Sequence, residues 1–166
     1  MKLIAAPACM FLLAATAIAA DKDFTSEDGK FAVQFHAKAK YKVGSIKDNG
    51  LVAPFVEAKV GENLQKVMHF DLPEVARGLE TGKLFDGGVD GEIRKSDGKL
   101  LSSKDFEWGP KKLPARDFVV EVKKRTTLFR MIRSEDRFYV VIAGGVDNFH
   151  TSDAAKAFLD SFEITK

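Results

Sequence analysis

Apolar side chains alternate with polar or small ones in several short runs of this chain. Phe31, Val33 and Phe35 occupy every second position, and the same period recurs over residues 118–122. A period of two is typical of a strand with one buried face. The pattern therefore predicts a chain in which strands dominate.

Two pairs of such runs are joined by short polar turns. The runs at 56–60 and 64–70 flank Gly61-Glu62-Asn63, and those at 127–133 and 137–143 flank Ser134-Glu135-Asp136. Short turns of this kind between strand-like runs predict two hairpins. Residues 44–50 are expected to be a polar connection, and Gly144-Gly145 to end the last strand.

Helical spacing appears near the C-terminus. Ala154, Ala157, Phe158 and Phe162 follow an i, i+3, i+4, i+8 pattern, which predicts a helix of about three turns. Thr151 or Ser152 is the expected N-cap.

A second helix is expected between residues 73 and 95. One interpretation takes Asp71 and Glu74 as a capping box that starts a helix near Pro73. The other places the helix later, where Phe85, Val89 and Ile93 repeat every four residues, and we favour it. Strands with two separate helical stretches, rather than repeated βαβ units, predict an α+β fold in which helices flank an antiparallel sheet.

The first twenty residues have the pattern of an export signal. Lys2 precedes an uncharged stretch over residues 3–19, and small residues stand before Asp21. We expect a signal peptide over residues 1–20, cleaved after Ala20 or one residue earlier, and a single mature domain over residues 21–166. An uncleaved anchor is less consistent with the weak hydrophobicity of this stretch. A lipoprotein modified at Cys9 is disfavoured because Ala6 stands where a lipobox has leucine and the apolar stretch before it is short. The protein is therefore expected to be periplasmic or secreted, with no transmembrane segment after signal removal.

Composition narrows the possible chemistry. The chain has 166 residues, 45% of them hydrophobic, with 26 basic and 24 acidic side chains and one cysteine. Removing residues 1–20 removes Lys2 and Cys9, which leaves 25 basic and 24 acidic side chains, a net charge of +1, and no cysteine. Disulfides and cysteine-ligated metals are then excluded. So small a charge also argues against a nucleic-acid partner, and no motif predicts a cofactor.

Five blocks of the sequence resemble a set of small exported bacterial proteins. They are FAVQF (31–35), GKLL (98–101), ARDFVVE (115–121), RFYVV (137–141) and AFLDSF (157–162). Those proteins are similar to the PsbP-like fold, an α/β/α sandwich around an antiparallel sheet, and the resemblance covers about residues 24–166. It implies accessory or binding roles more often than catalysis. This chain departs from the pattern at residues 36–40, where a proline- and glycine-containing turn is usual.

Histidine positions suggest an alternative function. His69 and Asp71 have the i, i+2 spacing that places two side chains on one face of a strand, and His150 would complete a His-Asp-His metal site. This predicts a small hydrolase or metal-dependent enzyme with a site near His69. The competing interpretation, a half-buried and hydrogen-bonded His69, is favoured. No G-x-S-x-G elbow or phosphate-binding glycine loop is present.

Charge is unevenly distributed along the chain. Residues 71–92 hold six acidic and two basic side chains, whereas residues 94–137 hold thirteen basic and seven acidic ones. This segregation suggests a basic docking face for an anionic envelope component or a protein partner. The residues chosen for that face are Lys38, Lys40, Lys42, Lys123, Arg130 and Arg133. Edge lysines that discourage strand pairing are the simpler interpretation.

Trp108 and Phe106 precede the Gly109-Pro110 turn signal. Their alternation with charged residues fits either a strand with one buried face or a small ligand contact, and core packing is favoured. Together these observations predict an exported, monomeric, non-catalytic accessory or binding protein of the bacterial cell envelope.

Overall fold

A computed structural model describes residues 24–36, 39–48 and 50–165. The predicted signal peptide over residues 1–20, its cleavage point after Ala20, and Lys38 lie outside the described residues. Within the described ranges, no helix combines the length and the apolar composition needed to cross a bilayer.

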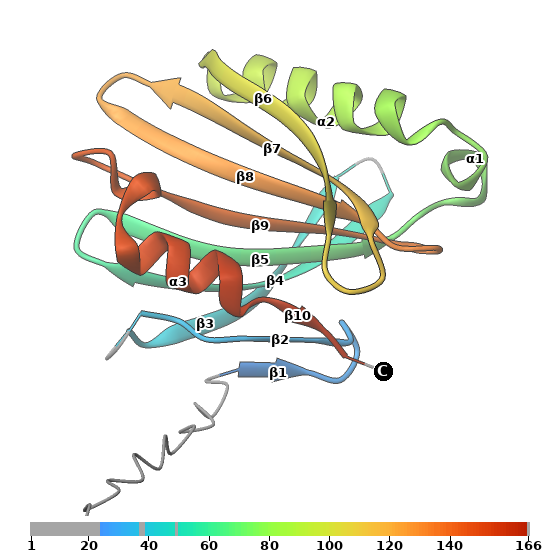
Figure 1. Ribbon diagram of the computed structural model, residues 1–166, viewed down its shortest axis with the longest axis horizontal. Coiled ribbons are helices and arrows are strands. Elements are labelled where there is room, and N and C mark those ends of the chain that lie inside the picture. Colours follow the sequence, from blue (N-terminus) through green and yellow to red (C-terminus); the bar gives the residue numbers. More distant parts are fainter. Residues whose placement is uncertain (1–23, 37–38, 49, 166) are drawn as a thin grey trace, which may run out of the picture.

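The chain forms short N-terminal strands, a long antiparallel sheet, and helices on both of its faces (Figure 1). The strands are β1 (Phe24–Ser26), β2 (Phe31–Val33), β3 (Tyr41–Asp48), β4 (Leu51–Val60), β5 (Asn63–Asp71), β6 (Lys99–Trp108), β7 (Leu113–Val122), β8 (Arg125–Arg133), β9 (Arg137–Gly145) and β10 (Glu163–Ile164). The helices are α1 (Glu74–Arg77), α2 (Thr81–Ser96), the 3₁₀ turn η1 (Phe149–Thr151) and α3 (Asp153–Ser161). This arrangement confirms the α+β class with an antiparallel sheet flanked by helices.

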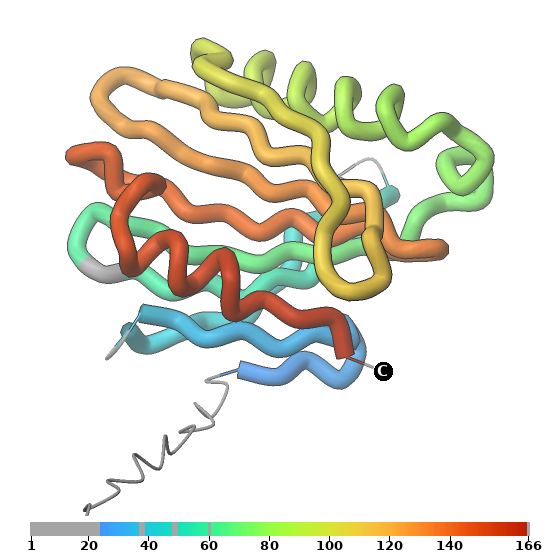
Figure 2. Tube along the Cα trace, in the orientation of Figure 1, coloured from blue at the N-terminus to red at the C-terminus, as the bar shows by residue number. Residues whose placement is uncertain are grey.

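Seven strands pair in the order β3-β4-β5-β9-β8-β7-β6, and every neighbouring pair is antiparallel. Both predicted hairpins are confirmed, as β4–β5 and β8–β9. A second sheet has the order β1-β2-β10, so β2 lies between the first and the last strand of the chain. In Figure 2 the blue and red ends of the trace run beside each other in this small sheet.

One prediction about strand ends is wrong and one is confirmed. Residues 44–48, expected in a polar connection, belong to the edge strand β3, which turns into β4 at Gly50 with a φ of +82°. Gly144 and Gly145, expected to stop a strand, are the last two residues of β9. An added Cβ on Gly144 would stand 2.8 Å from Thr127 Cγ2, so glycine permits a close approach between β9 and β8.

Helix α2 covers one face of the long sheet. Phe85 and Val89 are buried there against Phe118, Met131 and other apolar residues of β7, β8 and β9. The later of the two helix positions is therefore confirmed. The capping box is wrong, because Asp71 ends β5 and α1 begins after Pro73 without a side-chain cap.

Helix α3 and the small sheet cover the opposite face. Phe158 and Leu159 of α3 share a core with Phe31 of β2 and Val141 of β9. Ser152 caps α3, as predicted, by accepting a hydrogen bond from the Ala155 N–H at 3.2 Å. The Ser161 hydroxyl accepts from the Gln34 N–H at 2.9 Å, which fixes the end of α3 to the N-terminal segment.

Candidate functional site

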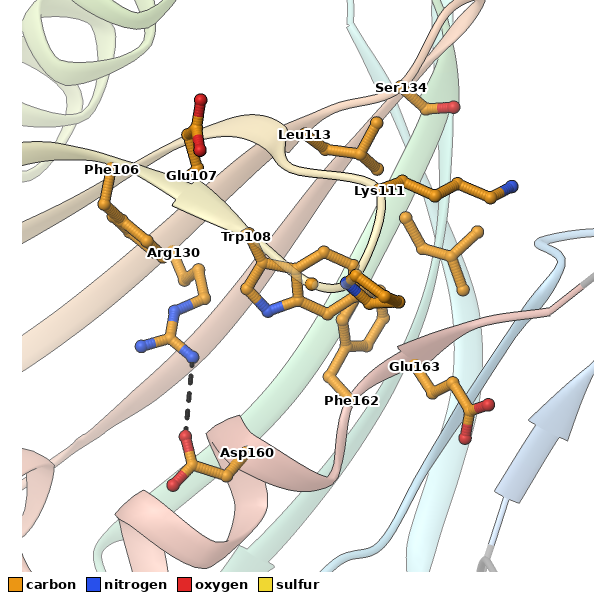
Figure 3. A pocket seen from close by; sticks show the side chains of 13 residues that line it. Phe106, Glu107, Trp108, Lys111, Leu113, Arg130, Ser134, Asp160, Phe162 and Glu163 are labelled. Atoms are coloured by element: carbon orange, nitrogen blue, oxygen red, sulfur yellow. Dashed lines mark ion pairs between the residues drawn. The ribbon is translucent and has the colours of Figure 1, made fainter.

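A cleft of about 640 Å³ opens between the β6–β7 hairpin and the segment that leads from α3 into β10 (Figure 3). Its lining combines apolar and charged side chains. The lining residues are Phe106, Glu107, Trp108, Gly109, Pro110, Lys111, Leu113, Arg130, Ser134, Asp160, Phe162, Glu163 and Ile164. This volume lies within the range of small-molecule binding sites, roughly 300–1,000 Å³.

Aromatic rings form the wall of the cleft. Phe106 and Trp108 are two residues apart on β6, so both side chains point to the same side of the sheet. Trp108 contacts Phe162 at the end of α3, with ring centroids 5.5 Å apart and ring planes inclined at 45°. The β6–β7 turn that holds this wall contains Gly109, whose φ of +69° favours glycine. Phe106 and Trp108 are partly buried against the core, as the favoured interpretation predicts, and both also line the cleft.

Arg130 is the cation held deepest in the cleft. Its side chain is only 14% exposed, and Nε and Nη2 each donate to a carboxylate oxygen of Asp117 at 2.9 Å. Nη1 donates to the Leu159 carbonyl at 3.4 Å and lies 3.8 Å from Asp160 Oδ1, the contact drawn as a dashed line in Figure 3. The guanidinium carbon lies 5.3 Å from the centre of the Phe106 ring. Arg130 therefore joins the charged rim to the aromatic wall.

Further charges surround the mouth of the cleft. Lys112 Nζ lies 3.8 Å from Glu107 Oε2, an exposed contact on the hairpin, and Lys111 and Glu163 also line the opening (Figure 3). The lining contains no histidine or cysteine. A wall of aromatic rings with a charged rim is suited to holding a ligand in place by contact and charge.

The residues predicted for a basic docking face do not lie together. Lys40 and Lys42 are exposed at the start of β3, and Lys123 is exposed in the β7–β8 turn. Arg130 points toward α3, whereas Arg133 points to the other side of β8, where it donates to the carbonyls of Leu79 and Arg77 and to Thr81 Oγ1. The described members of the set therefore occupy separate positions, and both arginines bind groups of the protein itself.

Two ion pairs join the acidic segment of the sequence, residues 71–92, to the basic segment, residues 94–137. Arg116 of β7 pairs with Asp86 of α2 and with Asp105 of β6. Arg137 at the start of β9 donates to Asp71 of β5 at 2.8 Å. Folding therefore pairs some of the segregated charges, Asp86 and Asp71, with arginines of neighbouring strands.

Within the described part of the chain, His69 belongs to no group of side chains that could hold a metal ion. The described residues include no cluster of three or more histidine, cysteine, aspartate or glutamate side chains with the arrangement of metal ligands. His69 is buried, with its ring 5.8 Å from that of Phe31 and 6.4 Å from that of Tyr139. His150 Nδ1 instead forms a hydrogen bond with Thr126 Oγ1 at 2.9 Å. The predicted His-Asp-His site near His69 is therefore wrong for the described residues.

Burial lowers the pKa of His69, and the nearby Arg137 lowers it further, against the opposing charges of Asp71 and Asp28. Burial also lowers the pKa of His150. Both histidines accordingly favour the neutral form in the folded protein.

Sequence reasoning missed the half of the cleft that comes from the C-terminus. Asp160, Phe162 and Ile164 lie more than fifty residues after Trp108 along the chain. The helical period near the C-terminus marked Phe162 as apolar, but no local pattern joins it to the β6–β7 turn. In comparisons with known proteins, this chain matches no protein-family model and no curated protein.

Proposed function

We propose that this protein is an exported binding protein of the bacterial cell envelope and that its binding site is the cleft beside Trp108. The observation that carries the proposal is an opening of about 640 Å³ whose wall is aromatic and whose rim is charged. The signal-like N-terminus supports export. The resemblance to exported proteins of the PsbP-like fold supports an accessory role, and an antiparallel sheet with helices on both faces is compatible with it.

The ligand expected in this cleft has an apolar part that stacks on the aromatic wall. Trp108, Phe162 and Leu113 offer that wall, and desolvated aromatic and apolar surface supplies most of the affinity of small-molecule sites. The charged rim then orients whatever group the ligand presents to water. Because stacking and charge are enough to hold such a ligand, a binding role requires no catalytic residue in the cleft.

Intrinsic fluorescence tests this role directly, because Trp108 is the only tryptophan in the sequence. The mature protein is titrated with 3-phenylpropanol, a neutral aromatic probe, while Trp108 emission is recorded. A saturable change with a dissociation constant on the order of 1 mM is expected for a ligand of this size. An emission that changes only linearly with probe concentration would contradict the proposed site.

A matched pair of serine variants locates the binding. Ser134→Phe places a ring in the cleft, whereas Ser102→Phe adds the same ring on exposed β6 outside the lining. We expect the first to abolish the saturable change and the second to preserve it. Equal binding by both variants would place the probe elsewhere.

Export is tested separately by expressing the whole chain in a bacterium and measuring the mass of the product in the periplasmic fraction. Cleavage after Ala20 or one residue earlier is expected. A full-length product that stays in the cytoplasm would contradict export but not the binding site.

A further inference from the structure

We propose that the cleft binds an extended peptide segment, which adds as a strand to the unpaired edge of β10 and places one apolar side chain against Trp108 and Phe162. This inference rests on the proposed function, since it assigns a ligand class to the same cleft. Three features carry it: the position of β10 at the edge of the small sheet, the direction of the Ile164 backbone groups, and the aromatic wall.

β10 is an edge strand that borders the cleft. In the order β1-β2-β10, one edge of β10 pairs with β2, and no strand of the described residues pairs with the other edge. Residues 162–164 line the cleft together with the β6–β7 turn, and in Figure 1 that turn lies on the side of β10 opposite β2. The unpaired edge of β10 therefore faces the cleft, and such an edge is a template for a further strand.

The backbone groups of Ile164 point toward this edge. In an antiparallel pair, alternate residues direct both N–H and C=O to the partner strand. The Thr165 N–H donates to the Lys30 carbonyl of the β2 side at 2.9 Å, so Thr165 and Glu163, two residues apart, direct their backbone groups to β2. Ile164 stands between them opposite Phe31, and its N–H and C=O are directed away from β2. They offer one donor and one acceptor to a ligand in the cleft.

A peptide paired with Ile164 directs one side chain to the aromatic wall. Residues opposite each other in a sheet point to the same face, as do residues two apart in one strand. Phe162 lies two residues before Ile164 with an extended backbone, φ −63° and ψ 132°, and its ring contacts that of Trp108. The ligand residue opposite Ile164 therefore shares the face of this wall, where an apolar side chain covers aromatic surface.

The shortness of β10 limits the contact to one residue of the ligand. β10 has two residues, so a single ligand residue forms both hydrogen bonds with Ile164. Main-chain hydrogen bonds carry no preference for sequence, whereas the wall selects an apolar side chain. The expected ligand is thus a short extended segment with one apolar residue, whose two neighbours point away from the wall.

Three neutral peptides test the inference by Trp108 fluorescence of the mature protein: acetyl-Thr-Leu-Thr-amide, and its derivatives N-methylated either at Leu or at the second Thr. Neighbouring N–H groups of an extended peptide point to opposite edges, so only one of the two methyl groups blocks a hydrogen bond to β10. We expect that derivative to bind about five-fold more weakly than the parent peptide, and the other to stay within about two-fold.

Equal affinities of the three peptides, or an equal loss in both derivatives, would overturn strand addition. Failure of the parent peptide to bind while 3-phenylpropanol still gives a saturable change would also overturn it, and would leave the binding site intact. A failure of every probe would contradict the site itself.

A pair of substitutions tests the protein side of the same contact. Ile164→Pro removes the N–H that points to the ligand, and proline is tolerated in an edge strand where that N–H faces away from the neighbouring strand. Ile164→Val keeps the N–H and is the matched control. We expect Ile164→Val to bind the parent peptide about five-fold more tightly than Ile164→Pro, while the two differ by less than about two-fold for 3-phenylpropanol. Equal peptide affinities, or a common loss of both probes in Ile164→Pro, would overturn the assignment to this N–H.

Discussion

Arg130 and Asp117 are register partners on β8 and β7, and the guanidinium of one donates to both carboxylate oxygens of the other. Both side chains are mostly buried, at 14% and 26% exposure. Arg130→Ala leaves the Asp117 carboxylate without these donors in a partly buried position, so we expect a loss of about 2 kcal/mol in the free energy of unfolding. Urea unfolding measures this difference.

Lys124→Ala is the control for that experiment, because Lys124 is exposed in the β7–β8 turn. The free energy of unfolding of Lys124→Ala should stay within about 0.5 kcal/mol of wild type. A similar loss in both variants would mean that Arg130 contributes no more than an ordinary surface cation.

Glu57 couples stability to acidic pH. Burial raises the pKa of Glu57, but two lysines oppose it: Lys42 Nζ lies 3.3 Å from Oε1 and Lys66 Nζ lies 3.5 Å from Oε2. The lysines outweigh burial, so the pKa is lowered from 4.5. A lowered folded-state pKa adds stability that is present above 4.5 and is lost as the pH falls through the folded value. Glu57→Gln should therefore be less stable than wild type at neutral pH, with a difference that shrinks on acidification. Urea unfolding at a series of pH values measures it, and a difference independent of pH would contradict the mechanism.

His69 should make the folded protein less stable as the pH falls. A cation whose pKa is raised by a salt bridge has the opposite effect. The pKa of His69 is lowered below 6.5 mainly by burial, so the unfolded chain binds the proton more readily. The stability that neutral His69 contributes is fully present above pH 6.5. It is lost as the pH falls toward the lower pKa of the folded state. His69→Phe, which keeps an aromatic ring between Phe31 and Tyr139, should lose less stability than wild type between about pH 7.5 and 5.5. Thermal unfolding across that range checks this, with His150→Gln made in the same background to remove the other histidine whose pKa is lowered.

Glycines of α2 and β9 should respond oppositely to alanine. Gly87 and Gly91 have open space where a Cβ would stand, so each alanine should stabilise the helix by up to about 1 kcal/mol. An added Cβ on Gly145 would collide with the Asn63 side chain and stand 3.1 Å from the Asn63 Cα, so Gly145→Ala should destabilise by roughly 1–3 kcal/mol. Chemical unfolding of the three variants compares them, and stabilisation by Gly145→Ala would show that Asn63 moves aside freely.

Local patterns predicted the elements whose burial is periodic. The two hairpins, the later position of α2 and the cap of α3 at Ser152 all follow from alternation or helical spacing, since each element buries one regular face. Edge strand β3 was missed because its side chains are mostly exposed, so alternation carries little signal there. The Asp71 capping box failed because a tertiary partner, Arg137, holds that carboxylate at the end of β5.

The site was predictable only in part. Alternation placed Phe106 and Trp108 on one face of a strand, but the cleft exists because Phe162 arrives from α3 on the other side. Likewise, counting charges along the chain predicted a basic face, whereas pairing such as Arg116 with Asp86 depends on which strands and helices become neighbours. Both the cleft and the ion pairs depend on which distant segments of the chain become neighbours in the fold.

The small sheet has a consequence for how the chain completes its fold. β2 pairs on one side with β1 and on the other with β10, which ends two residues before the C-terminus. One edge of β2 therefore stays open until β10 has been synthesised. Pairings this distant in sequence slow folding, so a chain still emerging from the ribosome keeps an incomplete N-terminal sheet.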